Sequence, residues 1–214
     1  MPKIVETTVL RLDELSEQAR NKARDWYREA SAYDDWHDCV FDDFETICAI
    51  LGVRLKTRSV RLFGGGTRQK PCIWFSGFAS QGDGASFECS YNFAKGATKA
   101  IRAHAPQDSE LHRIADALQA IQRRNFYQLC ADVHQRGRYC HEYSMTITVE
   151  RDGPTYQDMT AEAEDTLIEL LRDLARWLYR QLEREYEYQT SNKVTDEAIL
   201  ANEYTFTGEG RRFG

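Results

Sequence analysis

The 214-residue sequence has only four prolines and no long apolar run. No stretch approaches the ~20 apolar residues of a membrane-spanning helix, and the first residues lack the apolar core of a signal peptide. These absences predict a cytoplasmic protein with no membrane partner. The sequence also lacks internal repeats and Pro/Ser-rich linkers, so residues 1–214 are expected to form a single domain with a flexible tail at 208–214.

An excess of positive charge is also absent. Acidic residues outnumber lysine and arginine by 34 to 28, and the formal net charge is −6. This balance excludes a protein that binds nucleic acid by broad charge neutralisation, and no direct sequence-specific contact with nucleic acid is expected. An acidic protein suits a neutral or basic protein partner instead.

The six cysteines include no Cys-x-x-Cys pair, and in a cytoplasmic protein they are expected to be reduced thiols. Two sets of potential metal ligands occur, but neither has the spacing of a known site: His37 with Asp38 and Cys39, and His134 with Cys140 and His141. No metal and no cofactor is therefore predicted.

Hydrophobic periodicity predicts an α+β protein. Apolar residues at three- or four-residue spacing predict helices at 16–30, 34–51, 95–135 with breaks and an N-cap at Asp108 or Ser109, and 161–188. Alternating apolar and polar residues predict strands at 3–12, 53–63 with a bulge near Ser59, 70–78, 85–93, 139–150 and 204–206. These elements predict an antiparallel sheet of about four to five strands, with one face covered by helices, including one long C-terminal helix.

The predicted helix at 34–51 carries a cluster of carboxylates. Asp35, Asp38 and Asp42 fall on one face of this helix. The simpler interpretation is that acidic residues near a helix N-terminus are stabilised by the helix dipole. The functional interpretation is an acidic surface that recognises a basic partner.

The second candidate site is the polar turn between the strands predicted at 70–78 and 85–93. Ser80, Gln81 and Asp83 place three hydrogen-bonding side chains within four residues, and glycines flank Asp83. The simpler interpretation is a hairpin connection. The functional interpretations are a turn recognised by a partner or, as an alternative, a hydrolase-type site of Ser80 and Asp83 near His141. No Gly-x-Ser-x-Gly elbow is present, and a histidine on the apolar face of the strand at 139–150 is more often a core residue.

Three segments resemble a family of bacteriophage and prophage accessory proteins that has no assigned activity. The main motif is F-S-G-F-x-S-Q-G-D-G-A-S-F-E, from Phe75 to Glu88. The others are Leu12-x-Glu14-Leu15-Ser16-Glu17-Gln18-Ala19-Arg20 with Asp25-Trp26-Tyr27-Arg28, and Tyr139-x-His141-x-x-Ser144-Met145. The resemblance implies a small phage accessory protein, and such proteins often inhibit a host defence system, CRISPR–Cas complexes included, by occupying a surface.

The preferred interpretation is thus a non-enzymatic phage or prophage protein that inhibits a host defence or regulatory complex, in an anti-CRISPR-like manner, through protein–protein contacts. Its partner would be a host protein or nucleoprotein complex in the bacterial cytoplasm. The predicted partner-binding residues are Asp35, Asp38, Asp42, Ser80, Gln81 and Asp83. The alternatives are the hydrolase-type enzyme and a homodimer built on the helix Ala161–Tyr188.

Overall fold

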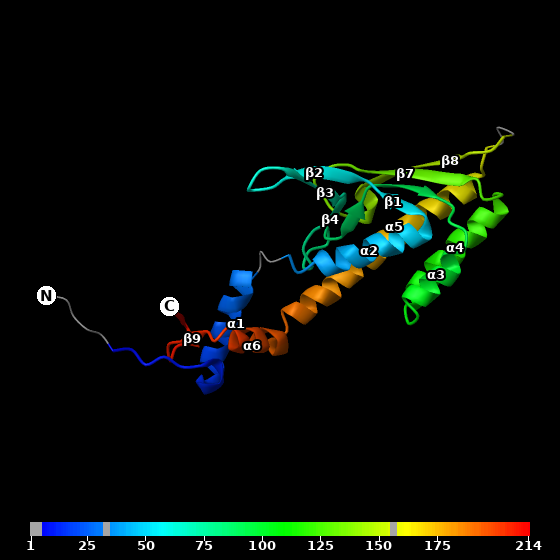
Figure 1. Ribbon diagram of the computed structural model, residues 1–214. Coiled ribbons are helices and arrows are strands. Elements are labelled where there is room, and N and C mark those ends of the chain that lie inside the picture. Colours follow the sequence, from blue (N-terminus) through cyan, green and yellow to red (C-terminus); the bar gives the residue numbers. More distant parts are fainter. Residues whose placement is uncertain (1–5, 32–34, 155–157) are drawn as a thin grey trace. The chain divides into compact units, whose positions relative to one another are not determined.

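The computed structural model describes residues 6–31, 35–154 and 158–214 (Figure 1). The chain forms two compact units. The terminal unit combines both ends of the chain, 1–38 and 184–214, and the central unit spans Cys39–Glu183. The predicted α+β class is confirmed, whereas a single domain over 1–214 stays a prediction.

The terminal unit is built on two helices and the C-terminal residues. Its elements are η1 (Leu12–Glu14), α1 (Glu17–Ser31), the end of α5 (Ala161–Gln189), α6 (Asn192–Ala201), β9 (Thr205–Phe206) and β10 (Arg212–Phe213). Phe206 lies in its core with Ala23 and Ile199. The buried Arg24 forms a bidentate pair with Asp196, with both N–O distances at 2.7 Å. Since a buried guanidinium needs such a partner, this pair joins α1 to α6.

The predicted opening strand at 3–12 is not present among its described residues. Leu10 instead forms one isolated bridge with Phe206, with two backbone hydrogen bonds of 2.8 Å. Residues 3–5 of that prediction lie outside the described part of the chain. The short strand predicted at 204–206 is confirmed as β9.

The central unit contains most of the sheet structure. Its helices are α2 (Asp38–Leu51), α3 (Ala97–His104), α4 (Ser109–Arg124), the greater part of α5, and the 3-10 helix η2 (Glu142–Ser144). Its strands are β1 (Val53–Leu55), β2 (Thr57–Arg61), β3 (Thr67–Pro71), β4 (Ile73–Phe75), β5 (Ala85–Phe87), β6 (Cys89–Asn92), β7 (Leu129–Gln135) and β8 (Met145–Arg151). In the described parts of the chain, no helix is both long enough and apolar enough to cross a membrane.

The main sheet has the order β1-β6-β7-β8, and all neighbours are antiparallel. One face is buried and contributes Val53, Cys89, Tyr91, Ala131, Val133 and Val149 to the core. The opposite face exposes Arg54, Asp132, His134, Thr146 and Thr148. Figure 1 shows α2 and α5 along the same side of this sheet. The predicted sheet with one helix-covered face is therefore confirmed.

The strands predicted at 53–63, 70–78 and 85–93 bend where they meet. Each is divided into two shorter strands: β1 and β2, β3 and β4, and β5 and β6. Lys56 N–H donates to Glu88 O at 2.8 Å, Cys72 N–H to Lys56 O at 2.8 Å, and Glu88 N–H to Cys72 O at 2.9 Å. Because each of these residues donates to one strand and accepts from another, three antiparallel strand pairs diverge from this point: β1–β6, β2–β3 and β4–β5. The division of 53–63 falls at Lys56 and not at the bulge predicted near Ser59.

Two segments differ from the predicted elements. Residues 129–135, predicted as helix, form β7, because α4 ends before Phe126 and Tyr127, which have positive φ angles of 56° and 62°. The strand predicted at 139–150 begins only at Met145, and the preceding residues form a loop with η2. His141 therefore lies in a loop and not on the apolar face of a strand.

Candidate functional site

Two segments singled out in the sequence meet in the central unit. They are the hairpin connection at 76–84, here the motif turn, and the residues at 139–144, here the histidine loop. Ser76 N–H donates to Gly84 O at 3.0 Å, which closes the hairpin. The Ser76 hydroxyl accepts from Gly84 N–H at 3.1 Å and donates to Cys140 O at 3.4 Å. One serine side chain thus connects the motif turn to the histidine loop.

The Asp83 carboxylate organises the inside of the motif turn. Its Oδ2 accepts hydrogen bonds from Ser80 N–H at 2.7 Å and Ala79 N–H at 3.0 Å. The backbone bond from Ser80 is the main cause that lowers the pKa of Asp83 below its usual value. Ser80 O in turn accepts from Asp83 N–H at 3.0 Å. The carboxylate is therefore an acceptor that holds the turn in one conformation.

Gly84 lies directly against His141. A Cβ atom at position 84 would be 2.9 Å from His141 Cδ2 and 3.0 Å from His141 Cα. Such distances are too short for real carbon contacts, and one neighbour is backbone, so a side chain requires the histidine loop to move. The glycine at this position is explained by close packing rather than by a turn conformation.

Tyr179 of α5 supports the other side of the motif turn. Its hydroxyl donates to Gly77 O at 3.0 Å, and its ring centroid lies 5.4 Å from that of Phe78. Burial raises the pKa of Tyr179, and the nearby Asp83 charge raises it further. The phenol therefore stays neutral at physiological pH and remains a hydrogen-bond donor to the turn.

The histidine loop has its own charged partners. His141 Nδ1 lies 3.0 Å from Glu142 Oε2, and the His141 ring stacks on Tyr143 with centroids 5.4 Å apart. Glu142 Oε1 accepts from Arg176 Nε of α5 at 3.0 Å. His141 Nδ1 also accepts a hydrogen bond from the backbone N–H of Tyr143 at 3.3 Å. Sequence patterns did not indicate Glu142, Arg176 or Tyr179, since their role depends on contacts between distant segments.

The hydrolase-type set is only partly assembled. The structure places His141 against Gly84, the residue that follows Asp83. In the described part of the chain, however, His141 forms no hydrogen bond with Ser80 or Asp83, and the bonds of Asp83 are directed to backbone N–H groups. The arrangement lacks the hydrogen bond between base and nucleophile that acyl transfer to a serine needs.

Gln81 and Ser80 form the exposed tip of the motif turn. Among the described residues, the Gln81 side chain takes part in no hydrogen bond, so its amide can donate to and accept from a partner. The internally bonded turn below it fixes the position of the Gln81 backbone.

The carboxylates predicted on one helix face are arranged differently. α2 begins at Asp38, so Asp35 precedes the helix, and the prediction of one shared face is wrong for Asp35. Asp38 and Asp42 do lie one turn apart on α2. Asp34, where the helix was predicted to begin, lies outside the described residues.

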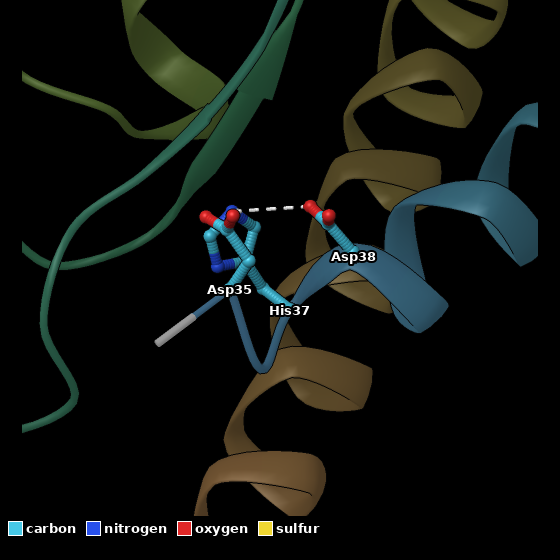
Figure 2. Close-up of side chains that lie close together, drawn as sticks. All are labelled: Asp35, His37 and Asp38. Atoms are coloured by element: carbon cyan, nitrogen blue, oxygen red, sulfur yellow. Dashed lines mark ion pairs between the residues drawn. The ribbon is translucent and has the colours of Figure 1, made fainter. Parts of the chain in front are cut away.

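Asp35, His37 and Asp38 form a small cluster at the N-terminus of α2 (Figure 2). One ligand atom of each residue lies within 4.8 Å of the others, and His37 Nε2 lies 3.8 Å from Asp38 Oδ1. Two carboxylates and an imidazole could hold a divalent transition metal. Cys39, which the sequence suggested as a ligand, is not part of the cluster. The absence of a metal stays a prediction.

The structure is that of an α+β protein in which helices cover one face of the sheet. The motif turn is preorganised by its own hydrogen bonds and by its contact with the histidine loop. Residues 36–192 match the family described as Domain of unknown function (DUF8835), and the chain belongs to this family. The matched range contains both the motif turn and the histidine loop. No curated protein and no solved structure matches the chain.

Proposed function

We propose that this protein is a non-enzymatic binding protein that acts through protein–protein contacts. The motif turn carries this proposal. The Ser76 hydroxyl and the Asp83 Oδ2 atom are occupied by hydrogen bonds within the turn and to the histidine loop, whereas Gln81 is exposed at its tip. Catalysis needs available reactive groups, while recognition needs an exposed group on a rigid support.

The exposed carboxylates support a basic partner surface. Asp35 and Asp42 are exposed, and half of the Asp38 side chain, 50%, is exposed. With a net charge of −6, the protein has the sign needed to occupy a surface that otherwise binds nucleic acid. These carboxylates and the motif turn are two separate proposed determinants of binding.

The proposed partner is a host defence or regulatory complex, and the proposed role is its inhibition. The resemblance to phage and prophage accessory proteins supports this part, because such proteins often act in an anti-CRISPR-like manner on a host protein or nucleoprotein complex. The acidic composition supports competition for a basic surface rather than direct binding of nucleic acid.

Affinity capture from host cells tests the proposal. The tagged wild-type protein is compared with Gln81→Ala and with the pair Asp38→Asn and Asp42→Asn. The charge-matched control is the pair Glu162→Gln and Glu164→Gln, two exposed carboxylates on α5. We expect one defence-complex subunit to be enriched by wild type and control but not by the other variants. Raising the salt from about 50 mM to about 500 mM should weaken capture, because screening reduces attraction between exposed charges. Capture that is unchanged in the variants and at high salt would reject the proposal.

A hydrolase-type enzyme is the second candidate, and one observation favours it. Glu142 lies 3.0 Å from His141 Nδ1, and among the described residues His141 Nε2 forms no hydrogen bond. In the tautomer that donates from Nδ1 to Glu142, Nε2 is the nitrogen that can act as a base. Assays with p-nitrophenyl esters and phosphates, using wild type and His141→Gln, test this. Turnover that is lost in the variant would support an enzyme, and equal background rates would exclude hydrolysis of these substrates.

A further inference from the structure

The outer edge of β8 is an unpaired strand edge with no protecting residue at its centre. β8 is the last strand in the order β1-β6-β7-β8 and pairs only with β7 among the described strands. Its central residues, Thr146-Ile147-Thr148-Val149, include no charge, proline or glycine. Exposed edges are usually protected by charged residues, proline or bulges, because a bare edge pairs readily with another strand.

The register with β7 determines which backbone groups point outward. Ser144 O accepts from Arg136 N–H at 3.0 Å, and Asp152 N–H donates to Gln128 O at 2.8 Å. Since hydrogen-bonded and non-hydrogen-bonded positions alternate in an antiparallel pair, the even-numbered residues of β8 bond to β7. The N–H and C=O groups that point away from β7 therefore belong to Met145, Ile147, Val149 and Arg151. In the described residues, none of these groups forms a hydrogen bond.

We propose that a second copy of this chain pairs antiparallel along β8 and joins two four-stranded sheets into one sheet of eight strands. With the twofold axis at Thr148, Ile147 lies opposite Val149 of the second copy, and Met145 lies opposite Arg151 of the second copy. In this register, every outward-pointing N–H and C=O group of both strands forms a hydrogen bond with the other copy. An axis at Ile147 or Val149 would leave a residue at one end without a partner.

The side chains are compatible with the same register. The even-numbered residues lie on the open face, where exposed Thr148 meets Thr148 of the second copy and Thr146 meets Glu150. No two like charges are opposed. Threonine and β-branched residues favour cross-strand pairing. This self-complementarity of β8 is the reason to place a second copy at this edge, in contrast to the dimer predicted on the helix Ala161–Tyr188.

Sedimentation and light scattering test the assembly, with lysine substitutions on one face of the sheet. We expect wild type to have twice the chain mass of 24.8 kDa at high micromolar concentration. Thr148→Lys opposes two lysines across the axis and should give a monomer with an unchanged circular dichroism spectrum. Asn92→Lys, exposed on β6, is the matched control and should stay dimeric.

A cysteine scan tests the register itself. Opposed residues in a non-hydrogen-bonded pair have Cβ atoms about 4.5–5.5 Å apart, near the reach of a disulfide. Under mild oxidation, Thr148→Cys should therefore cross-link two chains, and Thr146→Cys should not exceed wild type. A monomeric wild type would overturn the proposal, as would a dimer that persists in Thr148→Lys. A dimer lost instead on Tyr188→Glu, at the exposed end of α5, would assign the interface to the helix.

Discussion

At residue scale, Gly84 lies where the motif turn meets the histidine loop, and a side chain at this position would overlap His141. Gly84→Ala should lower the free energy of unfolding by about 1–3 kcal/mol, because its Cβ would overlap the ring and backbone of His141. Gly82→Ala is the matched control, since no atom lies within 4 Å of its added Cβ. Urea unfolding measures both. Equal effects of the two substitutions would contradict the close packing of Gly84 against His141.

Asp83 should make the stability depend on pH. Its pKa is lowered in the folded state by backbone hydrogen bonds, chiefly from Ser80. A lowered folded pKa contributes stability above the unfolded value of about 3.9, and this contribution is lost as the pH falls through the folded pKa. We expect Asp83→Asn to be less stable than wild type at pH 7 and the difference to shrink at acidic pH.

Urea unfolding of both proteins between neutral and strongly acidic pH measures this effect. The stability of the variant should still fall somewhat at acidic pH, because three other carboxyls also have lowered pKa values: Glu110, Asp116 and Glu169. If the difference in free energy of unfolding between wild type and variant is constant over the whole pH range, Asp83 does not contribute to the pH dependence of stability.

The cluster of Asp35, His37 and Asp38 is expected not to bind a metal tightly. Tetrahedral zinc ligands at about 2.0–2.2 Å from the ion lie about 3.3–3.6 Å from one another, whereas these ligand atoms spread over as much as 4.8 Å. Asp35 is also exposed. Titration calorimetry with Zn²⁺ or Mn²⁺ checks this, with His37→Ala as the comparison. Saturable binding that disappears in His37→Ala would overturn it.

At the scale of elements, Asp108 joins two helices of the central unit. Its Oδ1 accepts from Leu111 N–H at 2.9 Å as the N-cap of α4, and its Oδ2 accepts from Trp177 Nε1 at 2.8 Å. Asp108→Ala should cost about 1–3 kcal/mol, since it removes the cap and leaves a buried indole N–H without its acceptor. Ser109→Ala, the next residue and an exposed one, should change little. Thermal unfolding that is the same for both would contradict this role.

Sequence periodicity predicted α1, α2 and α5 well but failed for β7 and the histidine loop. In β7, apolar residues fit either a three-residue or a two-residue spacing, and pairing of Ala131 and Val133 with neighbouring strands selected the latter. In the histidine loop, alternation continued through Tyr143, yet that side chain is 63% exposed. Alternation alone does not form a strand where no neighbouring strand is available to pair.

At the scale of the whole molecule, the single domain predicted over 1–214 has a direct test. The chain forms two compact units, and α5 runs through their boundary. Because a continuous helix transmits unfolding from one end to the other, we expect one cooperative transition with equal calorimetric and van't Hoff enthalpies. Ile199→Ala, in the core of the terminal unit, should then shift the whole transition. Two separate transitions, of which this substitution shifts only one, would establish two domains.

The sequence by itself determined the α+β class, the extent of the long helix, a helix cap at Asp108 or Ser109 and the one-sided alternation of the sheet. These features depend on periodicity and on residues close in the chain. The tertiary structure alone decided where the strands divide at Lys56, Cys72 and Glu88, and which residues surround the motif turn. The bond from Ser76 to Cys140 spans 64 residues and that from Tyr179 to Gly77 spans 102. Such contacts follow from strand register and helix packing, which local patterns do not encode.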